Sequence, residues 1–268
     1  YAMTDLRGKI IWITGASGGL GEGLAQRAAA RGAKLILSAR RESELERVRQ
    51  SLPRPQEAAI LPVDLAQLGD DAMPLAEQAA AFFGPIDVLV NNAGLSQRAT
   101  ALETPMAGYR QLFEVDFFAP IVLTKALLPG WAERGAGHCV VVSSVFGHIA
   151  MARRSGYAAA KHALHGWYDC ARIELGQRGV NFTLACPGFV RTDISRNAVG
   201  PAGAAFGRSD DDIDGGMAPE FCAEKIWRAV ERDEYEVVIA GKERIAVWFK
   251  RFLPLRFYTA FARRLKVN

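Results

Sequence analysis

The sequence lacks several features, and each absence excludes a class of protein. No apolar run approaches the ~20 residues that a membrane-spanning helix needs, and no basic-then-apolar segment marks a secretory signal at the N-terminus. The four cysteines form no C-x-x-C pair, which excludes the common zinc-ribbon and redox motifs. His162 and His165 share a helix face, but no carboxylate or cysteine pattern in the sequence completes a metal site. We therefore expect a cytoplasmic protein with buried free thiols and no bound metal.

The net positive charge is confined to the end of the chain. The net charge is +4, but eight of the 33 Lys and Arg residues and one of the 29 acidic residues fall in residues 242–268. That segment therefore carries +7 and the remainder −3. A nucleic-acid-binding protein needs a basic face across its fold. We expect no nucleic-acid partner, and we divide the chain into a domain at residues 1–241 and a basic extension at 242–268.

Short apolar runs alternate with helical segments along residues 1–241. Strands that alternate with helices at ~25–40 residue spacing predict a parallel, doubly wound sheet with helices on both faces. Half of the residues are apolar, which is enough for a sizeable core. One long helical segment, Thr104 to Trp131, is interrupted near Pro120. The expected strands are Lys9–Ile13, Lys34–Ser38, Ala58–Val63, Ile86–Val90, His138–Val142, Val180–Cys186 and Glu236–Ala240.

The first expected strand runs directly into Thr14-Gly-Ala-Ser-Gly-Gly-Leu-Gly21, and a helix follows. A glycine-rich turn between a strand and a helix can hold a pyrophosphate on backbone N–H groups. The alternative is an ordinary glycine-rich loop. In this position the motif favours a single α/β domain of the Rossmann type with about seven strands.

The turn after the second expected strand points to the identity of the dinucleotide. Ala39-Arg40-Arg41 follows the strand, and no Asp or Glu occupies Ser38 to Arg41. An acid there would bind the ribose hydroxyl of NAD, whereas arginine favours the 2′-phosphate of NADP. We predict NADP(H) rather than NAD(H). The competing interpretation is that the arginines begin the exposed helix Glu42–Ser51.

Polar turns also follow the third and fourth expected strands. Asp64 could accept a hydrogen bond from an adenine amino group or cap a helix. Asn91-Asn92-Ala93-Gly94 combines asparagines, which can fix a turn by bonding the local backbone, with small residues beside which a flat ligand can lie.

The fifth expected strand ends at Ser143-Ser144, and a helix near Ser155 carries Tyr157-Ala-Ala-Ala-Lys161. The four-residue spacing places Tyr157 and Lys161 on one helix face. A lysine cation stabilises a phenolate, which lowers a phenol pKa that starts near ~10. Such a tyrosine can exchange a proton with a carbonyl or alcohol oxygen. The alternative is that this common helical pair serves packing and solvation.

Taken together, these motifs resemble the short-chain dehydrogenase/reductase family. The matching features are Thr-Gly-x-x-x-Gly-x-Gly at 14–21, Asn-Asn-Ala-Gly at 91–94, Ser144 thirteen residues before Tyr157, Tyr157-x-x-x-Lys161, and Pro187-Gly188. They occur in order over roughly residues 8–240. The run that starts Arg154-Ser-Gly-Tyr looks closest to the branch of 11β-hydroxysteroid dehydrogenases and dehydrogenase/reductase member 7-like proteins.

The resemblance implies an NADP(H)-dependent carbonyl reductase that interconverts a ketone or aldehyde and an alcohol, with an apolar lipid- or steroid-like substrate and a homodimeric or homotetrameric assembly. Tyr157 would be the general acid and base, Lys161 would hold the nicotinamide ribose, and Ser144 would bind the substrate oxygen. The implied cofactor-binding residues are Gly15, Ser17, Gly18, Gly19, Leu20, Gly21, Arg40, Arg41, Asp64, Asn91, Ala93, Gly94, Tyr157, Lys161, Pro187, Gly188 and Thr192.

One position departs from the family pattern. The family usually has an asparagine in the long central helix that completes a proton relay, but here the sequence reads Glu114-Val-Asp-Phe-Phe118. Asp116 can accept a hydrogen bond from water but cannot donate an amide N–H. Near Lys161 it would partly neutralise the effect of the lysine on Tyr157. We expect Asp116 to act in catalysis and to shift the pH–rate profile.

Two further segments bear on substrate and partners. Residues 193–219, rich in glycine and with acids at Asp210-Asp-Asp-Ile-Asp214, are expected to form a mobile lid over the substrate. In the extension, apolar residues recur at helical spacing among basic ones. This extension could lie on a membrane surface, or its apolar face could pack on the body or a second subunit. A lipid-binding protein and a non-catalytic cofactor-binding regulator therefore remain alternatives. The apolar positions are Ile245, Trp248, Phe249 and Phe252, then Tyr258, Phe261, Ala262 and Leu265.

Overall fold

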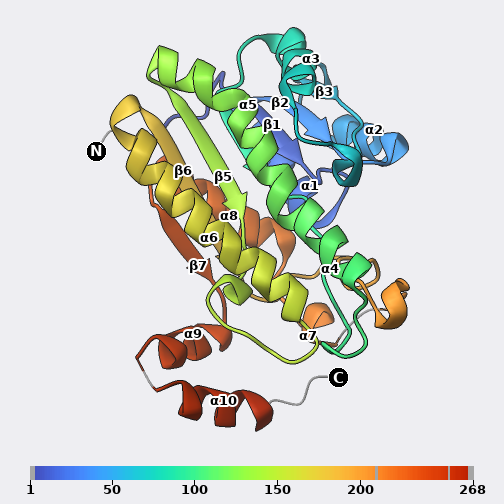
Figure 1. Ribbon diagram of the computed structural model, residues 1–268. Coiled ribbons are helices and arrows are strands. Elements are labelled where there is room, and N and C mark those ends of the chain that lie inside the picture. The colour runs from blue at the N-terminus through green and yellow to red at the C-terminus, as the bar shows by residue number, and fades with distance from the viewer. Residues whose placement is uncertain (1–3, 209–210, 253, 265–268) are drawn as a thin grey trace.

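The computed structural model describes residues 4–208, 211–252 and 254–264 (Figure 1). Tyr1-Ala2-Met3, Asp210, Leu265 and the side chain of Phe261 lie outside the described residues. Seven strands form one parallel sheet in the order β3-β2-β1-β4-β5-β6-β7, which confirms the predicted α/β fold. The strands are β1 (Ile10–Thr14), β2 (Lys34–Ser38), β3 (Ala58–Ile60), β4 (Val88–Asn91), β5 (Gly137–Val142), β6 (Val180–Pro187) and β7 (Glu236–Ile239).

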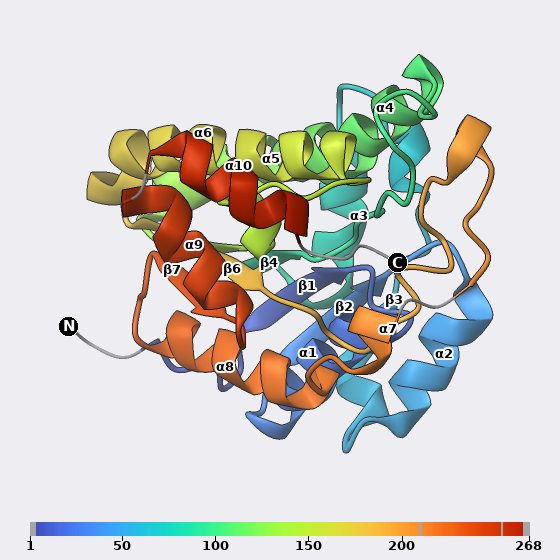
Figure 2. The same ribbon diagram turned by 90° about the horizontal axis from the view of Figure 1, so that it is seen from below.

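Helices cover both faces of the sheet, and Figure 2 shows the two layers. Because successive strand residues point to opposite faces, β5 sends Val140 and Val142 to one apolar core and Cys139 and Val141 to the other. Strands buried on both faces are apolar throughout, as their sequences are. One layer consists of α1 (Gly19–Ala30), α2 (Glu42–Ser51) and α8 (Pro219–Glu231), and the other contains α3 (Met73–Phe83), α5 (Ala119–Arg134) and α6 (Ser155–Leu175).

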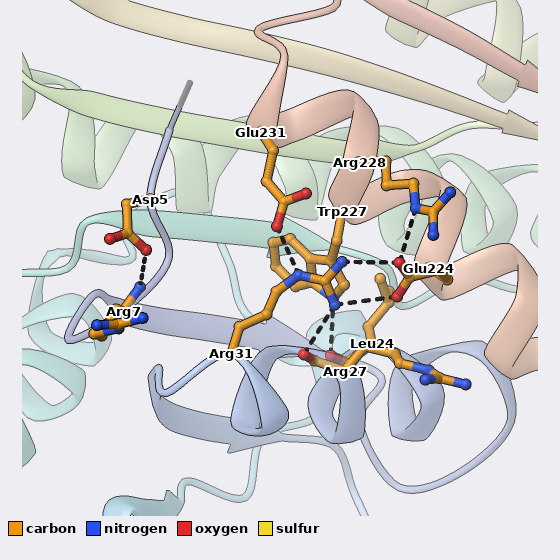
Figure 3. A network of polar contacts seen from close by, with 9 residues as sticks. All are labelled: Asp5, Arg7, Leu24, Arg27, Arg31, Glu224, Trp227, Arg228 and Glu231. Atoms are coloured by element: carbon orange, nitrogen blue, oxygen red, sulfur yellow. Dashed lines mark hydrogen bonds and ion pairs between the residues drawn. The ribbon is translucent and has the colours of Figure 1, made fainter. Parts of the chain in front are cut away.

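The first and eighth helices are tied together by polar contacts (Figure 3). Trp227 is fully buried, and its indole N–H donates to the carbonyl oxygen of Leu24 at 3.0 Å. Arg31, just beyond the end of α1, forms ion pairs with Glu224 at 3.1 Å and Glu231 at 2.7 Å. These ion pairs are partly exposed and contribute little, about 0–1 kcal/mol each. The buried tryptophan therefore contributes more than the ion pairs to holding α8 against α1, the helix that follows the glycine-rich turn.

The long central helical segment is interrupted, as the sequence predicts. It consists of α4 (Met106–Phe113), a π-helical turn at Glu114–Phe118, and α5. Pro120 has no N–H, and a proline ring conflicts with the carbonyl four residues earlier, here that of Asp116. A π-turn relieves this conflict, and such turns are frequent at functional sites. The proline thus accounts for the wider turn in which Asp116 sits.

The C-terminal extension forms two helices, α9 (Glu243–Phe252) and α10 (Leu255–Arg264), which lie near β7 and α6 (Figure 2). Ala246 and Tyr258 pack into a small core beside the start of α6. The Tyr258 hydroxyl accepts from the N–H of Ala150 at 2.9 Å and donates to its carbonyl. The predicted apolar face of α9 does not pack on the body, because Ile245, Trp248, Phe249 and Phe252 are all exposed.

Two expectations from the sequence concern regions around this core. The described part of residues 193–219 contains turns, a 3-10 helix at Pro201–Gly203 and the short helix α7 (Asp211–Asp214), and part of this loop borders the cavity described below. Among the described residues, no helix combines the length and apolar character needed to cross a membrane. The division of the chain at residue 241 stays a prediction.

Candidate active site

A cavity of about 400 Å³ opens where the strands end. In open α/β sheets ligands bind outside the carboxyl ends of the strands, at the point where the strand order reverses. Here that point lies between β1 and β4. Every residue that the sequence places in the site borders this cavity except Asn91. They are Gly15, Ser17, Gly18, Gly19, Leu20, Gly21, Arg40, Arg41, Asp64, Ala93, Gly94, Asp116, Ser144, Tyr157, Lys161, Pro187, Gly188 and Thr192.

The glycine-rich turn has the geometry of a phosphate cradle. Gly15 and Gly19 have φ values of 65° and 54°, a region that favours glycine. A Cβ atom at position 21 would lie 2.1 Å from the carbonyl oxygen of Gly15, so only glycine fits there. Gly18 caps α1 without any side-chain hydrogen bond, which leaves the first N–H groups of the helix for an anion. These residues fit the pyrophosphate of a dinucleotide.

The two asparagines after β4 have opposite orientations, and only one serves the site. Asn92 lines the cavity and donates to the carbonyl oxygens of Thr14 at 2.9 Å and Gly15 at 3.2 Å, which ties this turn to the glycine-rich turn. Asn91, which we expected at the cofactor, does not border the cavity: its side chain turns into the core and donates to Thr124 at 3.1 Å. The reason is the two-residue alternation of a strand, which sends neighbouring side chains to opposite faces.

The turn after β2 presents two arginines to the cavity. Arg40 and Arg41 are exposed and border it, and among the described residues neither guanidinium group forms an ion pair. Arg41 also precedes α2, as the competing interpretation of this sequence expects. Asp64 borders the cavity and caps a 3-10 turn by accepting from the N–H of Ala66 at 3.1 Å.

The serine, tyrosine and lysine of the predicted triad meet at one wall of the cavity. Lys161 lies 5.6 Å from the centre of the Tyr157 ring and donates to the carbonyl oxygen of Val142 at 3.1 Å. The Ser144 hydroxyl accepts from the N–H of Phe146 at 3.2 Å and donates to the carbonyl oxygen of Pro187 at 3.4 Å. Both Tyr157 and Lys161 are buried apart from the atoms that face the cavity. The arrangement can deliver a proton to a ligand oxygen beside Ser144.

Asp116 joins this group through a buried ion pair at the edge of the cavity. Its Oδ1 atom lies 3.1 Å from Nζ of Lys161, and both of its oxygens accept from the N–H of Leu95 at 3.2 Å. A Cβ atom at position 94 would lie 2.6 Å from Oδ1, so Gly94 makes room for the carboxylate as well as for a ligand. The side chain of Asp116 is fully buried.

Burial and neighbouring charges shift the pKa values of these groups. Burial raises the pKa of Tyr157; the Lys161 ammonium and the Ser144 hydroxyl act to lower it, and the Asp116 carboxylate raises it further. The lysine thus acts in the predicted direction, but burial outweighs it. Burial opposes the charge of Lys161, yet Asp116 and Tyr157 outweigh burial and raise its pKa. Tyr157 is therefore protonated at neutral pH, and Lys161 is charged.

Three residues of the site were not identified from the sequence. Gln97 is buried, and its Oε1 atom accepts from the N–H groups of Gly156 at 2.6 Å and Tyr157 at 3.3 Å, which fixes the start of α6. Arg98 and Arg154 are also buried, and both line the cavity. No spacing rule marks a glutamine or arginine in a loop as buried, so the sequence held no signal for Gln97 or Arg98.

Comparison with known proteins places this site in a family. The sequence model described as short chain dehydrogenase matches residues 9–201. A dehydrogenase/reductase SDR family protein 7-like from Drosophila melanogaster is 35% identical over 267 residues, which cover 97% of this chain and 81% of that protein.

Two solved structures resemble the whole domain. A short-chain dehydrogenase from Streptomyces avermitilis has a TM-score of 0.82 at 29% identity and covers 96% of each chain. A metagenomic short-chain oxidoreductase in complex with NADP has a TM-score of 0.72 at 27% identity, covering 88% of this chain and 99% of that one. This chain therefore belongs to the short-chain dehydrogenase/reductase family of oxidoreductases, in the branch that contains the SDR family protein 7-like members.

Proposed function

We propose that this protein is an NADP(H)-dependent carbonyl reductase that interconverts an apolar ketone or aldehyde and the corresponding alcohol. The observation that supports this most is the position of Ser144, Tyr157 and Lys161 at one wall of a cavity whose other end is the glycine-rich turn. A bound nicotinamide would supply the hydride. The tyrosine would supply the proton, because its raised pKa keeps it protonated at neutral pH.

Each side chain then has one task in the reduction. Tyr157 donates its proton to the carbonyl oxygen, and Ser144 hydrogen-bonds the same oxygen. Lys161 stabilises the phenolate that remains, and Asp116 keeps Lys161 charged through the buried ion pair. In the reverse direction the phenolate accepts the proton of the alcohol.

The cofactor and substrate classes have separate support. Arg40 and Arg41 offer two guanidinium groups to a 2′-phosphate, and a related structure is a complex with NADP. Phe146, Phe189 and Val190 border the cavity near Tyr157 and favour an apolar substrate.

The C-terminal helices favour a second role, contact with an anionic membrane surface. The side chains of Trp248 and Phe252 stack at 5.0 Å and are 61% and 64% exposed. Lys250 and Arg251 lie between them in the sequence, and residues 242–268 carry a net +7. Exposed aromatic residues beside basic ones are typical of helices that lie in a membrane interface. This role is compatible with the enzyme activity.

Replacing Tyr157 with phenylalanine tests the proposed chemistry. We expect NADPH-dependent reduction of a panel of apolar ketones and aldehydes to fall about 10²–10⁴-fold in kcat, the usual contribution of general acid catalysis. NADPH affinity should change little. Tyr235→Phe, at an exposed tyrosine distant from the cavity, is the control. Equal rates for the wild type and Tyr157→Phe would contradict the mechanism and favour a non-catalytic cofactor-binding regulator.

Removing the two arginines tests the cofactor. In Arg40→Ala/Arg41→Ala the Kd for NADPH should rise roughly tenfold or more, because a hydrogen bond to a charged group contributes about 1.5–3 kcal/mol. NADH binding should be unchanged. Thermal unfolding with each nucleotide measures both affinities. Arg49→Ala removes an arginine of α2 that pairs with Glu46 and does not border the cavity. A wild-type preference for NADH would overturn the assignment.

The ion pair should set the pH dependence of the reaction. Asp116 raises the pKa of Tyr157, so Asp116→Asn should lower it. Alcohol oxidation needs the phenolate and rises with pH through this pKa. The midpoint of the kcat profile should therefore move to lower pH in Asp116→Asn. Asp169→Asn makes the same charge change on the exposed side of α6 and should leave the profile in place. An unmoved or upward-shifted midpoint in Asp116→Asn would refute this account.

Vesicle cosedimentation tests the membrane contact. The protein should bind phosphatidylserine-containing vesicles more tightly than pure phosphatidylcholine, and added salt should weaken binding. Trp248→Ser/Phe252→Ser should weaken it at least tenfold, since each buried aromatic side chain contributes about 1.5–3 kcal/mol. Phe221→Ser, an exposed phenylalanine of α8, is the control. The membrane contact would be refuted if the wild type bound no vesicles and the double substitution instead dissociated an oligomer. The exposed face of α9 would then contact a second copy of the chain.

A further inference from the structure

Four side chains that the proposed reaction does not use converge behind the catalytic wall. They are His148, His165, Cys186 and Glu236, and each offers one metal-binding atom such that all four atoms lie within 4.8 Å of one another. They come from the segment after β5, from α6, from β6 and from β7. Two imidazoles, a thiol and a carboxylate make up a donor set typical of zinc sites.

The separations within this cluster match a tetrahedral ion. Zinc binds nitrogen and oxygen at about 2.0–2.2 Å, which makes the edge of the tetrahedron about 3.3–3.6 Å. The Oε2 atom of Glu236 lies 3.4 Å from Nε2 of His148 and 3.5 Å from Nδ1 of His165. The sulfur of Cys186 lies 3.7 Å from Nε2 of His165, on the side of the ring away from Glu236. Because the four donor atoms lie up to 4.8 Å apart, binding one ion requires these side chains to draw closer together.

The surroundings of His165 suit a metal ligand. A ligating histidine usually donates its second ring N–H to an oxygen, which fixes the ring. The Nε2 atom of His165 lies 2.9 Å from the hydroxyl of Ser143, so Nδ1 is the nitrogen directed at Glu236. Gly147 leaves space for the ring, because a Cβ atom there would lie 2.4 Å from Nε2.

A second observation concerns His148. Its Nε2 atom is buried and has no hydrogen-bond partner in the part of the chain that the structure describes, although a carboxylate oxygen is 3.4 Å away. In an ordinary hydrogen-bonded cluster that nitrogen would be paired, since buried polar atoms rarely lack partners. Its open position faces the atoms of the other three residues. Glu236 has 39% of its side chain exposed, which gives an ion a path from solvent.

From this geometry we propose that His148, His165, Cys186 and Glu236 form a zinc-binding site. The ion would connect the segment after β5, helix α6 and the last two strands. Tyr157, Lys161 and His165 follow one another at four-residue intervals on α6, so the site continues the face that carries the catalytic pair. Bound zinc would hold Ser143, and the neighbouring Ser144, in position from behind. This inference does not depend on the substrate or on the cofactor.

The test uses the full chain in a Cys170→Ser background, because Cys170 is an exposed thiol that could bind metal by itself. After treatment with a chelator, the protein is titrated with Zn²⁺ by calorimetry and with Co²⁺ by absorption. We expect one ion per chain, a thiolate-to-cobalt charge-transfer band, and a higher midpoint of thermal unfolding with Zn²⁺. His148→Gln and Glu236→Gln should each weaken binding at least about tenfold, and Cys186→Ser should remove the charge-transfer band.

Two matched controls separate this site from general metal binding. His162→Gln changes the neighbouring histidine of α6, which contacts Lys250 rather than the cluster, and should not alter Zn²⁺ affinity. Cys222→Ser changes another buried thiol and should leave the cobalt band. Zinc binding that persists unchanged in His148→Gln and Glu236→Gln, or no binding at all to the folded chain, would overturn the proposal. His148→Gln and Glu236→Gln test the proposal even if Cys186→Ser does not fold.

Discussion

Lys161 and Asp116 form a buried ion pair 3.1 Å long at the meeting point of α6, the π-turn and the segment after β4. Burying two opposite charges costs several kcal/mol for each ion and is tolerated only when further hydrogen bonds complete the pair. Here the N–H of Leu95 bonds both carboxylate oxygens, and the carbonyl of Val142 accepts from the lysine. The pair therefore requires four separate segments, β5 included, to stay in register, and all four border the cavity.

Burial does most to keep the tyrosine in its protonated form, because it raises the pKa of Tyr157. The ion pair adds to this effect: the Lys161 ammonium lowers that pKa, and the Asp116 carboxylate raises it again. The resting site thus holds a proton donor. A carboxylate where the family usually has an asparagine is consequently consistent with the proposed carbonyl reduction, because Tyr157 is already protonated at neutral pH.

Local sequence patterns predicted much of the fold and the pairing of Tyr157 with Lys161. The glycines of residues 15–21 and the four-residue spacing of Tyr157 and Lys161 are constraints between near neighbours, so they are readable in sequence. The sequence did not show which of Asn91 and Asn92 faces the cavity, because that depends on strand register. The exposed face of α9 was likewise undetermined, since helical spacing reveals an apolar face but not what covers it.

The sequence did not predict the cluster around His165, because its members are far apart in the chain. His165 looked isolated because its partners lie at positions 148, 186 and 236, on three other elements that only the completed sheet brings together. The parallel topology gathers the ends of β5 and β6 at one edge, and α6 crosses both. One face of α6 therefore carries two different groups. Tyr157 and Lys161 face the cavity, and His165, one turn further on, belongs to the cluster of metal-binding atoms. The neighbouring residues Ser143 and Ser144 at the end of β5 point to opposite sides. Ser143 therefore contacts His165 of the donor cluster, and Ser144 lies with the proton-donating pair.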